Sequence, residues 1–232
     1  MKEKISNIWE FILDLLFPPV CLVCRKRLNQ SKTTNLSEST NYPNSFSFLC
    51  CSCSQKIQIN STLDKKTGLA AAVSYNDEIP RQLIFLLKYQ KIKTAAVPLA
   101  EILTQYIGDL TLDIRNFSIV PVPLHWRREK ERGFNQSYLI AEQLSKNTGL
   151  PVLKNVLKRI RNTPSQVELK EKKKREMNVR GCFRVEKTEL LFQKNIIILD
   201  DVSTSGATMK EAIKVIKTSG AAKIIGLVVA KV

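Results

Sequence analysis

Residues Asn195 to Thr208 read Asn-Ile-Ile-Ile-Leu-Asp-Asp-Val-Ser-Thr-Ser-Gly-Ala-Thr, and this stretch decides the fold class. Its four consecutive aliphatic residues, Ile196 to Leu199, predict a central parallel strand that is buried on both faces. Asp200 and Asp201 follow where that strand ends, which is the edge at which open α/β sheets bind their ligands. We therefore expect an α/β fold with a site at this edge, and these two acids are the candidate catalytic residues.

The residues after the two acids are small, and they lead into a helix in which Ile213, Val215 and Ile216 recur at near-helical spacing. A turn of this kind offers backbone N–H groups, hydroxyls and a helix N-terminus to an anion, most naturally a phosphate. The candidate phosphate-binding residues are Ser203, Thr204, Ser205, Gly206, Ala207 and Thr208.

Three other interpretations of this stretch compete. A P-loop NTPase would need a G-x-x-x-x-G-K-[ST] sequence and a dinucleotide fold a G-x-G-x-x-G sequence, and the chain has neither. An ordinary strand-to-helix turn would explain two acids alone. Carboxylates and a phosphate cradle a few residues apart are what phosphoribosyl pyrophosphate (PRPP) needs for its ribose hydroxyls and 5′-phosphate. The stretch resembles the PRPP motif of type I phosphoribosyltransferases, with Ser205 where threonine is more usual.

Length and charge limit the possible classes of protein. A chain of 232 residues can hold one sizeable core, or one core and a small accessory module. The formal net charge of +16 favours polyanionic partners, such as nucleic acid, phosphorylated ligands or an anionic membrane surface. A solvated basic surface without a partner is the alternative. No uninterrupted apolar run reaches the ~18 residues of a transmembrane helix, so we expect no such segment.

The N-terminal segment predicts an amphipathic helix. Ile5, Ile8 and Ile12 fall on one helical face, while Glu10 and Asp14 interrupt the apolar sequence. Because no A-x-A cleavage site follows, we interpret the segment as a docking helix rather than a signal peptide or membrane anchor. This interpretation predicts a cytoplasmic protein.

Two Cys-x-x-Cys pairs flank an insertion rich in Ser, Thr and Asn. Each tight turn can present two sulfurs to one ion, and four thiolates fill the tetrahedral coordination of a structural zinc. Disulfides are the alternative, but a cytoplasmic location keeps thiols reduced. Cys51 makes the second pair ambiguous, and Cys182 is remote and expected in the core. The candidate zinc ligands are Cys21, Cys24, Cys50 and Cys53.

The chain divides near Lys65 into a zinc module with its N-terminal helix, residues 1–64, and a main domain, residues 65–232. The polar insertion, about residues 29–47, is interpreted as a mobile loop. Apolar runs predict strands at residues 69–75, 117–122, 152–159, 178–185, 196–199 and 223–230. Apolar residues at helical spacing predict helices at residues 80–88 and 94–107, a third that ends near residue 146, and a fourth that begins after residue 208.

A basic segment, Arg127 to Arg132, follows the strand expected at residues 117–122. In a parallel sheet it would lie on the same side as Asp200, where its cations could neutralise a pyrophosphate, although a solvated turn is the commoner outcome. His125 is the only histidine, and a structural role is more expected than a catalytic one. The candidate residues on the pyrophosphate side are Arg127, Arg128 and Arg161.

Taken together, these segments resemble the ComF family of competence-associated, phosphoribosyltransferase-like proteins over nearly the whole chain. The resemblance rests on an ordered series of motifs. They are the two Cys-x-x-Cys pairs after Pro18-Pro19, Leu87-Lys88-Tyr89, Val120-Pro121-Val122-Pro123, Arg132-Gly133-Phe134-Asn135-Gln136, Arg161-x-Thr163-x-x-Gln166-x-x-Leu169, Arg175-x-x-Asn178, and Asp200-Asp201 with its loop.

The resemblance implies a type I phosphoribosyltransferase fold, a mostly parallel sheet flanked by helices, with a small N-terminal zinc-binding module. It also implies a role in natural transformation, in which single-stranded DNA enters the cell. A helicase encoded beside the family member is the implied partner, and contact with membrane-associated uptake machinery is possible. The long insertion between the cysteine pairs departs from the compact finger of the family.

Two functions follow from these expectations. As an enzyme, the protein would transfer a phosphoribosyl group in nucleotide or base salvage, with Mg²⁺ bridging the pyrophosphate and ribose oxygens of PRPP. As a binding module, it would hold single-stranded DNA, mostly through phosphate contacts, because the basic stretch has few aromatic residues. We rank DNA handling first and leave the enzymatic activity open. The candidate DNA contacts are Lys170, Lys172, Lys173, Lys174 and Arg175.

Overall fold

The structure is a computed structural model that describes residues 18–28, 46–60, 63–64, 68–110, 113–163 and 177–232. Within these residues, five strands form one sheet in the order β1-β2-β7-β6-β3. β2, β7, β6 and β3 run parallel, and β1 pairs antiparallel with β2. The predicted mostly parallel α/β sheet is therefore confirmed, with β6 in its interior. The strands are β1 (Leu63–Asp64), β2 (Leu69–Ser74), β3 (Phe117–Pro121), β6 (Asn195–Ser203) and β7 (Ile224–Lys231).

The aliphatic run of β6 is buried on both faces of the sheet. Ile196 and Ile198 belong to one core, while Ile197 and Leu199 belong to the other. Successive side chains of a strand point to opposite faces, so a strand covered on both sides requires a continuous apolar run. This is why the apolar sequence ends abruptly where β6 leaves the core at Asp200.

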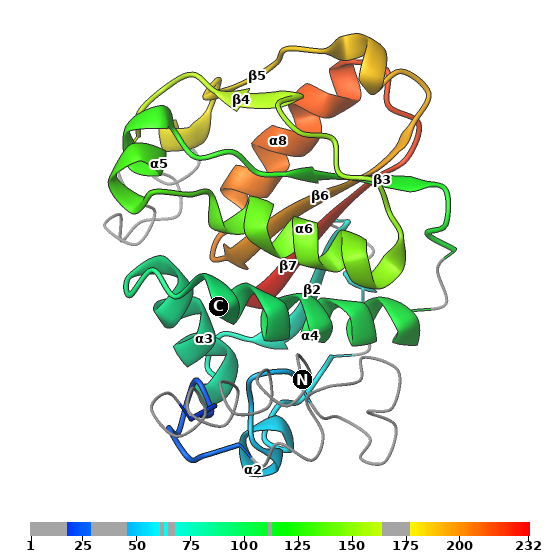
Figure 1. Cartoon of the computed structure of the whole chain (residues 1–232). Helices are drawn as coiled ribbons and strands as arrows, with labels where there is room; N and C mark the ends of the chain where they lie inside the picture. The colour runs from blue at the N-terminus through cyan, green and yellow to red at the C-terminus, as the bar shows by residue number, and fades with distance from the viewer. Residues whose placement is uncertain (1–17, 29–45, 61–62, 65–67, 111–112, 164–176) are drawn as a thin grey trace, which may run out of the picture.

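Helices cover the two faces unequally (Figure 1). One face is covered by α3 (Glu78–Lys88), α4 (Ala96–Asp109) and α6 (Gln136–Thr148). The other is covered by α8 (Ala207–Thr218), with the hairpin of β4 (Leu157–Arg159) and β5 (Phe183–Val185) beside it. A Cβ added to Gly226 of β7 would lie 2.7 Å from the Cγ of Met209, so the close approach of α8 to the sheet requires glycine there.

The cysteine-bearing segment packs beyond α3 and α4, on the side away from the sheet (Figure 1). Its buried residues Leu22, Phe46 and Leu49 join the same core as these two helices. Its helix is α2 (Cys51–Ser54), and the remaining short elements are η2 (Lys93–Ala95), α5 (Trp126–Arg132) and η3 (Thr188–Leu190). The division into residues 1–64 and 65–232 stays a prediction. The N-terminal helix and most of the polar insertion lie outside the described residues.

Two strand predictions were wrong in part. In the strand expected at residues 152–159, Val152 makes only an isolated bridge, and the chain turns at Asn155 before β4 begins. The strand expected at residues 178–185 begins only at Phe183. The buried residues of β4 and β5 pack in the core that contains α8 instead of extending the main sheet. The basic segment after β3, for which no element was predicted, forms the helix α5.

The helix boundaries differ from the sequence predictions by a few residues. α3 begins at Glu78, two residues before the expected Pro80, and a 3-10 turn precedes α4. Among the described residues, no helix combines the length and apolar character needed to cross a membrane.

Candidate functional site

The two acids lie where β6 emerges between its neighbouring strands. Leu199 pairs with Pro121 of β3, and Asp200 pairs with Val228 of β7. A hydrogen bond from the Val122 N–H to the Leu199 carbonyl oxygen (2.8 Å) extends the β3 pairing to the edge. The sheet therefore fixes the backbone of both acids, and parallel strands place the ends of β3, β6 and β7 together, as predicted.

Asp201 is buried and forms an ion pair with Lys88 from the last turn of α3. Its carboxylate Oδ2 lies 2.8 Å from the Lys88 Nζ. Its Oδ1 accepts a hydrogen bond from the Val202 N–H (2.7 Å). Burial lowers the pKa of Lys88, but the attraction of Asp201 outweighs burial, and the pKa lies above its ordinary value.

Asp200 has a different environment, set by the start of α6. Its Oδ1 accepts hydrogen bonds from the Ser137 Oγ (2.8 Å) and from the Asp201 N–H (2.9 Å). Asn135 caps α6 by accepting from the Ser137 N–H and donating to the Val122 carbonyl oxygen, which fixes Ser137 against the end of β3. Burial and the neighbouring Asp201 raise the pKa of Asp200 to about 7 despite these bonds.

The small-residue loop forms a pocket over the start of α8. Its lining includes Asp200, Ser203, Gly206 and Thr208, and its cavity volume of about 10 Å³ makes it a shallow depression. The Ser203 side chain is 6% exposed, and its Oγ has no hydrogen-bond partner within the described residues. Gly206 has a φ of 74° at the N-cap of α8, a conformation that favours glycine. A buried hydroxyl without a partner is costly, so this pocket suits a ligand that accepts hydrogen bonds.

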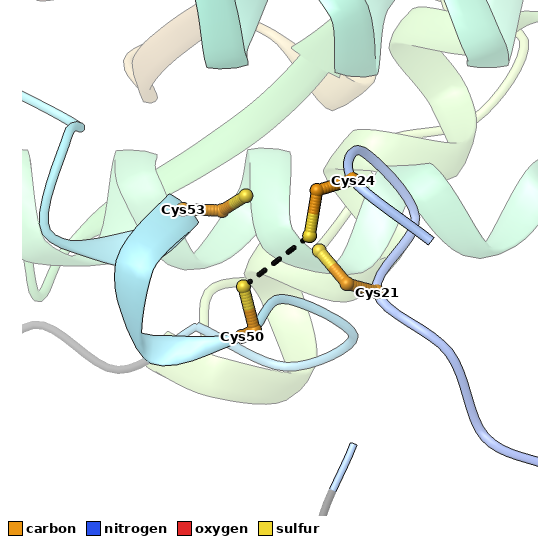
Figure 2. A group of neighbouring side chains, drawn as sticks. All are labelled: Cys21, Cys24, Cys50 and Cys53. Carbon is orange, nitrogen blue, oxygen red and sulfur yellow. Dashed lines mark hydrogen bonds between the residues drawn. The ribbon is translucent and has the colours of Figure 1, made fainter. Parts of the chain in front are cut away.

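Four cysteines converge at the second site (Figure 2), where Cys21 and Cys24 come from one turn and Cys50 and Cys53 from the start of α2. Their sulfur atoms all lie within 4.8 Å of one another, and the Cys24 and Cys50 Sγ atoms are 3.5 Å apart. Zn–S bonds of about 2.3 Å place tetrahedral sulfurs roughly 3.8 Å apart, so the four thiols fit a zinc ion.

The same cluster settles which cysteine belongs to the second pair. Cys51 is exposed and is not part of the cluster, whereas Cys53 is 5% exposed and points into it. A hydrogen bond with the Lys26 backbone lowers the pKa of Cys24 to about 7, whereas burial raises the pKa of Cys50 and of Cys53, so a bound metal would have to drive the deprotonation of those two thiols. Cys182 is fully buried in the α8 core, as predicted.

Comparisons with known proteins agree with this geometry. The family model described as "Phosphoribosyl transferase domain" matches residues 92–231, which include both acids and the loop. "DNA utilization protein YhgH" of Salmonella typhi is 30% identical over 224 residues, covering 90% of this chain and 96% of that protein. The chain belongs to the ComF family of phosphoribosyltransferase-like proteins.

Two further ComF relatives carry competence names. "Competence protein ComFC" of Bacillus subtilis is 28% identical over 210 residues, covering 88% of this chain and 80% of that protein. "Competence protein F" of Haemophilus influenzae is 36% identical over 109 residues, and the match spans 47% of that protein. A solved glutamine PRPP amidotransferase from B. subtilis is 19% identical, with a TM-score of 0.37, over 56% of this chain and 25% of that one.

The arginines expected on the pyrophosphate side of this ComF protein have different surroundings. Arg127 lies with its guanidinium carbon 5.2 Å from the ring centre of Trp126. Arg128 donates to the Thr163 carbonyl oxygen (2.7 Å), and Arg161 donates to the Arg180 carbonyl oxygen (3.1 Å). Two of the three therefore hold the β4–β5 hairpin and its ends. Their role toward pyrophosphate stays a prediction.

His125 caps α5 and is buried, with its Nδ1 accepting from the Arg127 N–H (3.4 Å). Burial and the nearby arginines lower its pKa, so the imidazole is neutral around pH 7. This is the structural role favoured from the sequence. The five basic residues at 170–175 lie outside the described residues, between Thr163 and Met177.

Two residues that the sequence analysis did not assign take part in the site. Lys88 belongs to the Leu87-Lys88-Tyr89 motif, which carried no role, and Ser137 directly follows the Arg132 to Gln136 motif. Arg159, also unassigned, is half-buried in the β4–β5 hairpin, where its guanidinium carbon lies 5.6 Å from the Phe183 ring centre and it donates to the Thr163 Oγ1 (2.6 Å). The motifs gave a signal for the first two, but no motif included Arg159.

Proposed function

We propose that the protein binds PRPP at the carboxyl end of β6 and acts in competence-linked DNA utilization by handling single-stranded DNA. The observation that carries the ligand site is the buried Ser203 hydroxyl, which has no partner among the described residues and faces the loop before α8. A phosphate group offers acceptor oxygens to such a hydroxyl and to the backbone N–H groups of a helix start. The 5′-phosphate would occupy this loop.

Asp200 and Asp201 would take the ribose end of the same ligand. Burial and the neighbouring Asp201 raise the pKa of Asp200, so a cation or hydroxyl donor bound here would favour its charged form. Ribose hydroxyls can donate to these carboxylates, and Mg²⁺ prefers carboxylate and phosphate oxygens, so the acids fit both partners. Bound Mg²⁺ would supply charge that neutralises the pyrophosphate oxygens.

The proposed DNA role is supported by the relatives and by charge. Relatives that cover most of this chain are named for competence and for DNA utilization. The net charge of +16 suits a chain that contacts a phosphate backbone. A cytoplasmic location, with reduced thiols that hold a structural zinc, belongs to this proposal, as do the helicase partner and the membrane-associated uptake machinery.

Binding of a single-stranded oligonucleotide across a salt series tests the DNA role. If the basic stretch contacts DNA, changing Lys170, Lys172, Lys173, Lys174 and Arg175 to Gln should weaken binding and lower the salt slope by about 0.7 for each lost phosphate contact. Sequence preference should stay flat. No oligonucleotide binding by the wild-type chain near physiological salt would contradict the DNA role.

The second candidate is an active phosphoribosyltransferase of nucleotide or base salvage, favoured by the retained acids and loop. The two candidates differ in what the bound PRPP does. A salvage enzyme releases pyrophosphate when one particular acceptor base is added, whereas a DNA-handling protein binds oligonucleotides and releases none. A pyrophosphate-release screen across nucleobases, with and without Mg²⁺, separates them.

A further inference from the structure

The outer surface of α5 carries an exposed tryptophan among cations. Trp126 is 61% exposed, with the Arg127 guanidinium carbon 5.2 Å from its ring centre and the His125 ring 5.6 Å away. Tryptophan side chains are usually largely buried, because burial of their apolar surface is favourable, and Trp126 is not buried in this way. The basic stretch near residue 170 has few aromatic residues on which a base could stack, whereas α5 has an exposed one.

The cations of α5 divide into engaged and outward-facing groups. Arg128 holds Thr163, and Arg132 donates to the Gln136 side chain, so these two support the fold around the site. Arg127 and Lys130 are exposed on the same short helix as Trp126. Trp126, Arg127 and Lys130 are called the α5 surface below. It combines a π face with two cations whose side chains, within the described residues, make no hydrogen bond to a neighbouring element.

The α5 surface lies near the carboxyl edge of the sheet, because α5 follows β3 directly. The Lys91 Nζ donates to the Glu131 carbonyl oxygen (2.9 Å), which joins the loop after α3 to the last turn of α5. The same α3 carries the exposed aromatic pair Phe85 and Tyr89, with ring centres 5.3 Å apart. Aromatic and basic side chains thus border the end of the sheet that holds the two acids.

We propose that the α5 surface is a stacking site for single-stranded nucleic acid, with a base on Trp126 and backbone phosphates at Arg127 and Lys130. The inference rests on the proposed DNA role and locates its contact surface. Every base has a π face, so stacking on an aromatic side chain tolerates any sequence, and nearby cations add phosphate contacts. Arg127 can keep its position beside the ring, where its guanidinium adds a cation–π contribution.

Tryptophan fluorescence gives a direct test on the full chain, because Trp9 and Trp126 are its two tryptophans. In a Trp9→Phe background, only Trp126 reports. Titration with an unlabelled oligothymidine should quench this fluorescence at the concentrations at which the oligonucleotide binds. Binding without quenching would contradict stacking on Trp126 and would leave the ring for another class of partner, such as a protein.

Substitutions give the second test. Trp126→Ala should weaken oligothymidine binding roughly 5- to 160-fold, which corresponds to about 1 to 3 kcal/mol for one stacked base. Changing Arg127 and Lys130 together to Gln should lower the salt slope by about 1.4, because each phosphate contact on a single strand contributes about 0.7. Neither change should alter the protein's far-ultraviolet circular dichroism.

Matched control residues lie at the other end of the sheet, where β6 and β7 begin. Phe192 is 62% exposed, nearly the same as Trp126, and Lys194 and Lys223 are exposed just before β6 and β7. Phe192→Ala, and Lys194→Gln with Lys223→Gln, should leave binding unchanged. If the wild type binds but both α5 variants bind equally well, the inference is wrong and the DNA role stands. If the wild type does not bind the oligonucleotide, both this inference and the proposed DNA role are wrong.

Discussion

Asp201 is a buried carboxylate whose charge is balanced by a lysine from a distant part of the sequence. An isolated buried charge is expensive, and the 2.8 Å contact with Lys88 compensates for part of that cost. Removing one partner therefore costs more than removing both. Lys88 is accordingly the residue that pairs with Asp201 at the edge of the sheet.

Lys88→Met should lower the free energy of unfolding by about 3 to 5 kcal/mol, because Asp201 is left buried without its cation. Adding Asp201→Asn to this variant should restore much of the loss. Urea titrations of both variants measure these differences. Lys56→Met is the control, since Lys56 and Glu78 are exposed and 4.0 Å apart, a surface pair worth about 0 to 1 kcal/mol. A Lys88 variant as mild as the control would show that the pair is not important for folding.

Asp200 makes stability depend on pH in a defined direction. Its pKa is about 7 in the folded protein and 3.8 ordinarily, so between these values only the folded state holds the proton. Its contribution to stability is present at about pH 4 and is lost as the pH rises toward 7. Denaturant titrations should therefore show Asp200→Asn gaining stability relative to wild type over this range.

Asp113→Asn is the control for this pH series. A hydrogen bond from Arg115 lowers the pKa of Asp113 to about 2, so its contribution is lost only as the pH falls below about 4. Its difference from wild type should stay flat between pH 4 and 7. An equally flat difference for Asp200→Asn would contradict the raised pKa.

Individual residues could be predicted only where their roles depend on local sequence. Asp200 and Asp201 follow an apolar run, so their place at a strand end is readable from the sequence. The partners Lys88 and Ser137 come from other helices, and which helix reaches Asp201 depends on packing that no local pattern encodes. Arg159 could not be predicted for another reason: β4 has only three residues, too few to show a periodic pattern.

At the scale of elements, long apolar segments were predicted well and short ones were not. β6 and β7 are interior parallel strands, and burial on both faces gives them continuous apolar sequences. The segment at residues 152–159 has only four apolar residues among eight; Val152 makes an isolated bridge to Ile119 of β3, and Leu153, Val156 and Leu157 pack in the core that contains α8. Sequence pattern does not distinguish burial against a sheet from pairing within it.

The four cysteines should hold about one zinc ion per chain, measurable by metal analysis of protein purified without chelator. Metal binding contributes folding free energy to small modules, so chelation should speed hydrogen exchange at residues 18–28 and 46–60 and spare β6 and β7. Cys53→Ser should lose the metal, whereas Cys51→Ser, which alters a cysteine outside the cluster, should retain it. Absence of zinc, or equal loss in both variants, would contradict the site.

At the scale of the whole molecule, the zinc module and the ligand site lie on different parts of one scaffold. Glu101 of α4 accepts hydrogen bonds from the Ser47 backbone N–H (2.7 Å) and hydroxyl (2.5 Å), which joins the cysteine segment to the helices on one face of the sheet. The loop before α8 and the end of β6 form the ligand pocket at the carboxyl edge of that sheet. The described part of the cysteine segment therefore packs on the helices, and none of its described residues lines that pocket.

The family and the fold could be predicted from the sequence, but the surface proposed to contact DNA could not. Family motifs cluster where chemistry fixes both residue type and spacing, as in the loop after Asp201. Cations that contact a phosphate backbone need only charge and exposure, so many arrangements of the +16 net charge would serve. The sequence predicted the basic stretch near residue 170 and left the exposed Trp126 unnoticed.

Calorimetric titration with PRPP tests the central claim most directly, that the carboxyl end of β6 is a phosphoribosyl pyrophosphate site. The wild-type chain should bind PRPP in the presence of Mg²⁺ and more weakly without it. The double variant Asp200→Asn with Asp201→Asn should keep its circular dichroism spectrum and lose this binding, because the ribose end of the ligand loses both carboxylates. A folded double variant that binds PRPP as tightly as wild type would contradict the account.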